Sequence, residues 1–408
     1  MTDAGLPLTQ HRTVFDRWRP ISISLYMALV GYGVLVGIPV ISTAWVNLLG
    51  FSEVEVGRVA GADLGGLSLG AAITALFIAR VDRRLLVLSS AILAIAANAL
   101  CTVMVEYEQV LWLRLLAGFG SGIYTAVAVA TLGATSRPAR AFNMMLFAFA
   151  FSQALELHVL PQLSMDGIYL VFIGAYAISL LFVGWIPPRP VPKRIATGLD
   201  PEEAIAVAPA AFPSVPTYVP WLVLGAITAT YINIGAYWTY IELASAHPSI
   251  STANADWVGK VLVGASFLSL LGCLFATVTS NRYGLARPLL VTLAAHSAIV
   301  GMLAAGINNV NIVVSVFMFN FLWIFVDVYQ MATIANVDHS GRFASLIPAA
   351  QGLGQIIGPN VAATILAFGM GYSGVFIMCA SATMSGLLLY AFMYIRLRKA
   401  IPALADAA

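Results

Sequence analysis

Stretches of about twenty mostly hydrophobic residues recur along the whole chain, separated by short polar segments. A helix needs about 20 residues to cross the hydrocarbon of a bilayer. Strands of a membrane barrel would instead alternate polar and apolar positions over about ten residues. The pattern therefore predicts membrane-spanning helices, at roughly residues 21–48, 55–79, 85–105, 110–134, 141–161 and 167–186, and again at roughly 220–245, 255–280, 288–306, 309–335, 343–369 and 373–395.

The predicted fold is an all-α membrane protein with twelve transmembrane helices in two six-helix bundles, at 21–186 and 220–395. Residues 187–219 between them contain several prolines and charged residues, which indicates a flexible linker. Residues 1–20 and 396–408 are polar ends. The first apolar stretch is too long for the core of a cleaved signal peptide, so we expect it to be retained as a helix.

Composition supports a lipid environment, because 60% of the residues are hydrophobic and only 9% are charged. Soluble domains carry roughly 25% charged residues. Motifs for other functions are missing from the sequence: there is no Walker-type phosphate loop, no nucleophile elbow and no spacing of metal ligands. We therefore expect no enzyme activity, cofactor, metal or nucleic-acid partner.

Basic residues sort to one side of the predicted topology. If the N-terminus is cytoplasmic, 17 of the 20 Lys and Arg residues fall on the cytoplasmic side, and the others, Arg58, Arg114 and Lys260, lie in or beside helices. The excess of basic residues on the cytoplasmic side of membrane proteins then predicts a multi-pass protein of the cell inner membrane with both termini in the cytoplasm.

Two short motifs occupy equivalent places in the two halves. The loop after the second helix contains Asp82, Arg83 and Arg84, and residues 281–284 after the eighth read Asn-Arg-Tyr-Gly. Residues 114–122 in the fourth helix read Arg-Leu-Leu-Ala-Gly-Phe-Gly-Ser-Gly. Weak internal symmetry of this kind is typical of transporters that move two halves about a central site.

These motifs and the six-plus-six layout resemble the major facilitator superfamily across nearly the whole chain. The resemblance implies a monomeric secondary transporter that works by alternating access, with helices one, four, seven and ten around a central cavity. It further implies that Asp82, Arg83, Asn281 and Arg282 lock the inner sides of the two halves together. The alternative is that these residues only set topology.

The fifth helix lacks the Gly-Pro motif that drug/proton antiporters of the resembled family carry. The nearest such pair is Gly358-Pro359 in the eleventh helix. This difference favours uptake over drug efflux.

Asp327 is the strongest candidate for a functional residue. Asn320, Trp323, Asp327 and Gln330 are spaced three, four and three residues apart, so they share one face of the tenth helix. Desolvation favours a protonated carboxyl and hydration an ionised one, so a carboxyl in a cavity that opens and closes binds and releases a proton. Asp327 is therefore predicted to carry a proton or bind a cation. The alternative is a structural hydrogen-bonding stripe.

Other polar residues within helices are expected to face a cavity or a partner, because charges in the membrane are costly. We predict that Arg114 pairs with Glu156 and that Glu242 pairs with Lys260 as an outer gate, serving either a solute or simple bracing. Additional cavity candidates are Tyr231, Asn233, Trp238, Gln351 and Gln355.

Asp63 lies beside two stripes of glycines in the second helix, which are expected to be packing surfaces.

The leading functional hypothesis is proton-coupled symport of a small organic solute. An organic anion is preferred, because Arg114 and Lys260 offer partners for a carboxylate. Proton-coupled efflux of lipophilic or cationic drugs is the alternative within the same class. A third hypothesis is a membrane receptor or lipid-handling protein that does not transport.

Overall fold

The computed structural model describes residues 14–78, 80–135, 138–188, 216, 218–283, 286–337, 343 and 346–400, and these form helices joined by short loops. The first half contains α1 (Trp18–Gly31), α2 (Gly33–Leu49), α3 (Glu53–Phe77), α4 (Arg83–Cys101), α5 (Tyr107–Gly133), α6 (Pro138–Val159) and α7 (Met165–Leu180). The second contains α9 (Tyr218–Ala246), α10 (Ala255–Ala265), α11 (Leu268–Tyr283), α12 (Ala286–Gly301), α13 (Asn309–Val337), α14 (Ile347–Ala367) and α15 (Gly371–Ala400). The predicted linker at 187–219 lies almost entirely outside the described residues.

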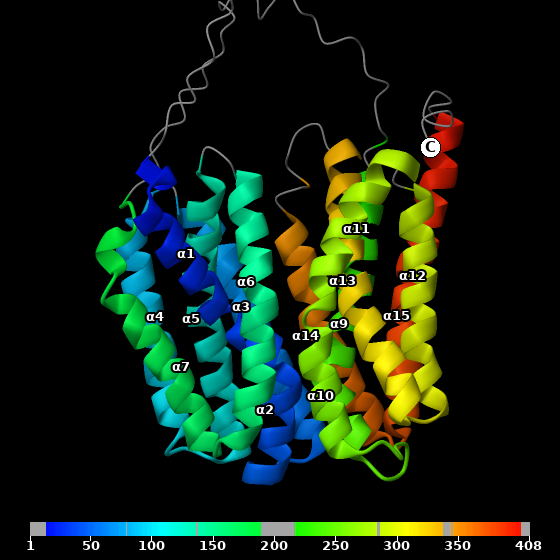
Figure 1. Ribbon diagram of the computed structural model, residues 1–408, viewed down its shortest axis with the longest axis horizontal. Helices are drawn as coiled ribbons and strands as arrows, with labels where there is room; N and C mark the ends of the chain where they lie inside the picture. The colour runs from blue at the N-terminus through cyan, green and yellow to red at the C-terminus, as the bar shows by residue number, and fades with distance from the viewer. Residues whose placement is uncertain are drawn as a thin grey trace, which may run out of the picture.

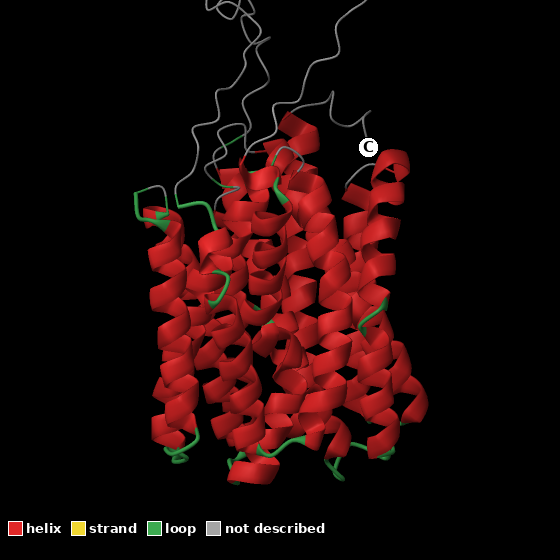
Figure 2. Cartoon of the chain, turned by 60° about the vertical axis from the view of Figure 1, so that its left-hand side comes forward, coloured by secondary structure: helices red, strands yellow, loops and turns green. Residues whose placement is uncertain are grey.

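The prediction of twelve membrane helices is confirmed. In the described part of the chain, ten helical stretches are long and apolar enough to cross a membrane, and α7 is a shorter apolar helix. The remaining one, α14, has 21 residues but contains glutamines, an asparagine and a proline. α1 and α2 together form the first span, and α10 and α11 belong to the eighth. Figure 2 shows the helices running alongside one another, with loops gathered at the two ends.

Local capping signals fix several helix starts. At α3, Ser52 accepts a hydrogen bond from the backbone of Glu55, whose carboxylate in turn accepts one from the backbone of Ser52. Asp82 and Asn254 cap α4 and α10 with their side chains. Gly50 ends α2 with a φ of 72°, a left-handed conformation that favours glycine.

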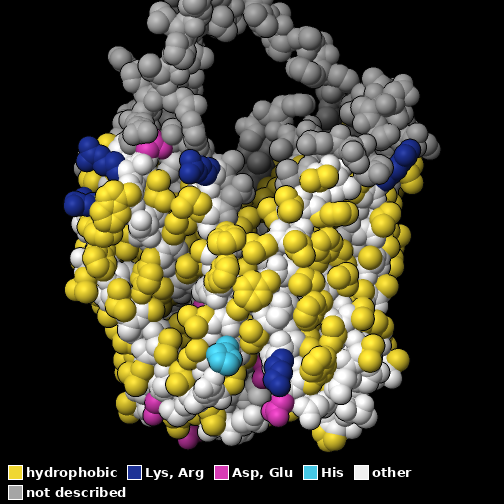
Figure 3. All heavy atoms as spheres, viewed as in Figure 1, with side chains coloured by type: hydrophobic (Ala, Val, Ile, Leu, Met, Phe, Trp, Pro, Cys, Tyr) yellow, Lys and Arg dark blue, Asp and Glu magenta, His cyan; other side chains and the backbone are white. Residues whose placement is uncertain are grey.

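The two halves lie side by side, with α1–α7 on the left of Figure 1 and α9–α15 on the right. We call the face where α1 begins and α15 ends the terminal face, and the opposite face the distal face. Figure 3 shows a broad hydrophobic band, with basic side chains mainly at the terminal rim and most acidic ones at the distal rim. Such a band is what a surface in contact with lipid requires.

Glycines allow α3 to approach helices on two sides. A Cβ atom at Gly66 or Gly70 would come within about 3.0 Å of backbone atoms of α5, so α3 and α5 pack at backbone distance inside the first half. The second stripe, Gly57, Gly61 and Gly65, faces α14 of the other half. The expectation that both stripes are packing surfaces agrees with these contacts.

The glycine contact between α3 and α5 predicts that Gly118→Ala destabilises the fold. Its Cβ would lie 2.8 Å from Oδ1 of Asp63 and 2.9 Å from that residue's carbonyl carbon. Overpacking of this kind costs roughly 1–3 kcal/mol. The midpoint of thermal unfolding in detergent should therefore fall below that of the parent protein.

Gly174→Ala in α7 is the matched control, since no heavy atom lies within 4 Å of a Cβ at that position. It provides the same gain in helix propensity without the clash. Equal unfolding midpoints for the two variants would contradict the packing described for α3 and α5.

Candidate functional site

A cavity of about 300 Å³ lies between the two halves. Its walls come from α2, α3 and α6 of the first half and from α9, α11, α13 and α14 of the second, with Tyr32 at the junction of α1 and α2. The volume is within the range of pockets that bind small organic molecules. Six of the candidate residues line it: Tyr231, Asn320, Trp323, Asp327, Gln351 and Gln355.

Asp327 is bound to the facing helix of its own half. The hydroxyl of Tyr231 on α9 lies 2.7 Å from Oδ2 and 2.9 Å from Oδ1 of Asp327 on α13, and it donates to the carboxylate. A Cβ at Gly354 of α14 would lie 2.5 Å from Cβ of Tyr231, so only glycine leaves room for the tyrosine. Three helices of the second half therefore set the position of this carboxylate.

Amide side chains surround the remainder of the cavity. Gln153 of α6 and Gln351 and Gln355 of α14 line it, and among the described residues their side chains have no hydrogen-bonding partner. Asn320 donates one bond to the carbonyl of Val316 in its own helix, at 3.0 Å. These amides offer both donors and acceptors to a bound molecule.

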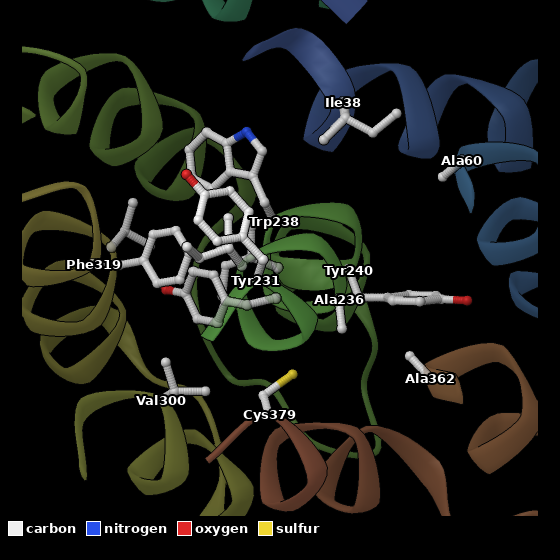
Figure 4. Packing of buried hydrophobic residues seen from close by; sticks show 14 of the residues in the cluster. Ile38, Ala60, Tyr231, Ala236, Trp238, Tyr240, Val300, Phe319, Ala362 and Cys379 are labelled. Carbon is white, nitrogen blue, oxygen red and sulfur yellow. The ribbon is translucent and has the colours of Figure 1, made fainter. Parts of the chain in front are cut away.

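Aromatic rings pack together beside the cavity, where Tyr231 and Trp323 line it and Trp238 and Phe319 lie behind them. Trp238 of α9 stacks on Phe319 of α13, with ring centroids 5.9 Å apart, and Trp323 lies 6.4 Å from Trp238. Figure 4 shows Tyr231, Trp238 and Phe319 gathered between α9 and α13. The indole N–H of Trp238 donates to the carbonyl of Val36 on α2, at 3.3 Å, and so joins the two halves just beyond the cavity.

The predicted pairing of Arg114 with Glu156 is wrong. Arg114 of α5 instead forms an ion pair with Asp63 of α3 and donates a second bond to Asn98 of α4, at 2.7 Å. Asp63 and Arg114 are 1% and 2% exposed, and neither lines the cavity. The reason is that the glycine contact draws α3 against α5, so Asp63 becomes the nearest carboxylate.

Glu156 lies on α6 against the glycines of the first span. It accepts a hydrogen bond from Ser152 at 3.1 Å, and its second oxygen is buried without a partner in the described part of the chain. A Cβ at Gly37 of α2 would lie 3.0 Å from that oxygen.

The predicted gate between Glu242 and Lys260 is also not formed. No ion pair joins these two side chains among the residues described. Glu242 lines a second, distal cavity, and Lys260 is exposed on α10. Because Lys260 lies on the exposed side of α10, the carboxylate of Glu242 has no cation beside it.

Two further candidates hold helices together and do not line the cavity. Gln330 donates to Thr230 of α9 at 3.0 Å, and Asn233 lies 3.4 Å from His296 of α12. Of the four residues predicted to share one face of α13, Asn320, Trp323 and Asp327 line the cavity and Gln330 does not. Trp238 likewise lies beyond the lining, in the contact with Val36 described above.

The fourth transmembrane helix, α5, contributes none of the residues that line the cavity. Its glycines bring it against α3, so it packs away from the centre. The first, seventh and tenth helices line the cavity as expected, and the second, fifth, eighth and eleventh line it as well. The sequence-based prediction missed Gln153, Ser68 and Tyr32 there. The amide of Gln153, within a predicted membrane span, was an available signal.

The halves are bonded to each other on the distal side. Arg58 of α3 donates to Asn360 Oδ1 and to the hydroxyl of Thr364 on α14, both at 2.9 Å. Tyr240 of α9 donates to the carbonyl of Glu53 at 2.8 Å. On the terminal side, no hydrogen bond or ion pair between the halves occurs in the described part of the chain. This conformation is closed at the distal face.

The residues predicted to lock the terminal side bond within their own half in this conformation. Asp82 caps α4, and Arg83 donates to Thr131 of α5 at 3.2 Å. The side chains of Asn281 and Arg282 lie outside the described residues. The lock remains a prediction for the conformation that is closed at the terminal face.

A family model for the Major Facilitator Superfamily matches residues 21–359. The chain belongs to the major facilitator superfamily. It is therefore a membrane-embedded transporter of a small solute and not an enzyme.

Solved structures with a similar fold include the nucleoside transporter NupG, in its natural form and as a single-residue variant. Each has a TM-score of 0.70 and 12% sequence identity, over 92% of this chain and 99% of that one. No curated protein sequence matches this chain. At 12% identity the likeness concerns the fold alone.

The buried Arg114–Asp63 pair gives a testable prediction about stability. Removing one partner of a buried pair leaves an uncompensated charge and costs roughly 3–5 kcal/mol, whereas replacing both is often nearly neutral. Arg114→Met and Asp63→Asn should each lower the unfolding midpoint of this transporter in detergent. The double variant should recover much of the loss, and strictly additive losses would refute the pair.

Proposed function

We propose that this transporter is a proton-coupled symporter of a small, uncharged organic solute, with Asp327 as the proton carrier. One observation carries the proposal: among the described residues that line the central cavity, Asp327 is the single carboxylate, and amides and aromatic rings surround it. Three of those amides have no partner among the described residues and are available to a solute. Aromatic rings provide apolar contact for a flat molecule.

The cavity does not support the organic anion that was preferred from sequence. That preference depended on Arg114 and Lys260, but Arg114 is bound to Asp63, and Lys260 is exposed on α10. No Lys or Arg lines the central cavity in the part of the chain that is described. An anion placed there would lie beside Asp327 without a compensating charge.

In symport of an uncharged solute, the carboxylate of Asp327 binds and releases the proton. When the proton is bound, Asp327 is neutral and donates or accepts hydrogen bonds, and when the proton leaves, the carboxylate still accepts from Tyr231. Because Tyr231 and Asp327 lie on different helices, the change in charge acts directly on the contact between α9 and α13. That contact is the means by which protonation would influence the opening of the cavity.

Exchange of a lipophilic cation for a proton is the second candidate. It is favoured by the absence of basic side chains from the described lining of the cavity. A single carboxylate holds either a proton or a cation, so this reading requires exchange in place of symport. The two candidates therefore differ in whether Asp327 is needed for the solute to bind.

We further propose that the protein is a monomer in the cell inner membrane with both termini in the cytoplasm. The distribution of Lys and Arg supports this orientation. The terminal face is then cytoplasmic, and a conformation closed at the distal face is the one that exchanges solute with the cytoplasm.

Nucleosides are the first solutes to test. They are uncharged, carry a flat ring and several hydroxyl groups, and so suit a lining of amides and aromatic rings. The similarity of fold to a nucleoside transporter makes them a reasonable starting point.

The decisive experiment compares two assays of Asp327→Asn in proteoliposomes. Asparagine resembles the protonated carboxyl, so we expect exchange of labelled for unlabelled nucleoside to continue at a rate within about threefold of wild type. Accumulation driven by a proton gradient should fall by tenfold or more, to about the background of empty liposomes.

Other outcomes separate the candidates. Loss of exchange as well as accumulation would show that Asp327 is needed for the solute to bind, which contradicts its proposed role as proton carrier alone. Labelled lipophilic cations would then test the cation reading. Unchanged accumulation would remove Asp327 as the proton carrier. Gln330→Ala serves as a control on the same helix, because Gln330 bonds Thr230 and does not line the cavity.

A further inference from the structure

A second cavity, of about 320 Å³, lies near the distal face between the two halves. Its walls come from α2 and the 3-10 turn at Leu160–Gln162 in the first half, and from α9 and α10 in the second. The lining is mainly aliphatic, with Val40, Leu160 and Val258 among its members. Glu242 is its only charged side chain among the described residues.

The two cavities are arranged in series along the same helices. On α2, Val36 lines the central cavity and Val40, one turn later, lines the distal one. On α9, Tyr231 lines the central cavity and Glu242 the distal one. Trp238 lies between Tyr231 and Glu242 in sequence and bonds the carbonyl of Val36, so a hydrogen bond between the halves occurs between the two sets of lining residues.

The carboxylate of Glu242 lacks a hydrogen-bond donor among the described residues. Its Oε2 atom is buried and has no hydrogen-bonding partner in the described part of the chain. The nearby hydroxyls are directed elsewhere, since Thr43 donates to Pro39 and Ser245 to Ile241 in their own helices. Lys260 makes no ion pair with it. A buried carboxylate with neither a donor nor a counter-charge is costly, so this site favours a ligand that brings a positive charge.

We propose that the distal cavity is a second binding site, which takes a small organic ammonium compound with Glu242 as its anchor. The cation offsets the buried carboxylate, and the aliphatic walls contact the methyl or methylene groups of the ligand. The site does not depend on the role of Asp327 in the central cavity. It therefore stands or falls independently of the proposed symport.

An occupant of this cavity touches both halves at once. The space exists in the conformation that is closed at the distal face, and separating the halves there would dismantle its walls. A ligand shifts an equilibrium toward the state that it binds better. Ammonium compounds at this site are therefore expected to hold the distal side closed and to slow transport.

The test measures protection of a cysteine placed in the distal cavity. Asn47 lines that cavity and is exposed, and Cys273 lines the central one. In full-length Asn47→Cys protein, the rate at which a maleimide modifies each cysteine is followed by mass spectrometry. Choline is the probe, and 3,3-dimethylbutan-1-ol, which replaces its nitrogen by carbon, is the uncharged control.

We expect choline to slow modification at position 47 at least threefold and to leave Cys273 unaffected, while the uncharged analogue protects neither. Adding Glu242→Gln should raise the choline concentration for half protection about tenfold or more, the usual effect of losing a charge-assisted contact. Adding Asp327→Asn should leave that concentration unchanged. Unfolding midpoints of both variants establish that they are folded.

Three results would overturn the proposal. Absence of protection at position 47 would show that choline does not occupy the distal cavity. Protection that survives Glu242→Gln, or is matched by the uncharged analogue, would remove Glu242 as the anchor. Protection of Cys273 that disappears in Asp327→Asn would place the ammonium site in the central cavity. The first two results leave the symport proposal unaffected, whereas the third would favour cation exchange at Asp327 over symport.

Discussion

The cost of an unsatisfied polar group in hydrocarbon explains the positions of three charged side chains within the helices, Arg58, Arg114 and Asp327. Arg114 avoids this cost by binding Asp63 and Asn98 inside the first half. Arg58 avoids it by binding Asn360 and Thr364 across the two halves. Asp327 avoids it by accepting a hydrogen bond from the hydroxyl of Tyr231 at the edge of a cavity. One physical requirement therefore yields a brace within a half, a contact between halves and a candidate binding site.

Hydrophobic periodicity and the sorting of Lys and Arg were sufficient to predict the fold. Each depends on a property of the chain that is local, namely the length of an apolar stretch and the charge of the loop that follows. The hydrophobic pattern does not predict the break in the first span at Tyr32, because the apolar residues continue through it. The last helix, α15, runs to Ala400, beyond the predicted end at residue 395. A helix end that lies in water is polar, so the hydrophobic pattern does not reveal it.

The candidate site was predicted in part. The face of α13 through Asn320, Trp323 and Asp327 follows from helical spacing alone, and these residues do line the cavity. Pairings between helices failed, because sequence gives the depth of a residue in the membrane but not which neighbour its helix will face. Arg114 and Glu156 were matched by depth, yet the glycines of α3 and α5 decided the partner. The amides of α14 were found, whereas Gln153 was overlooked since its helix was not expected at the cavity.

The effect of replacing a glycine of α3 by a larger residue depends on which of the two glycine stripes it belongs to. Gly66 and Gly70 contact α5 in the same half, so larger residues there act on the folding of that half and hence on the amount of protein in the membrane. Gly57 and Gly61 contact α14 in the opposite half, and opening of the distal face would break that contact. Larger residues on that side would therefore alter turnover at an unchanged abundance. Neighbouring glycines of one helix would thus produce two different phenotypes in a population of variants.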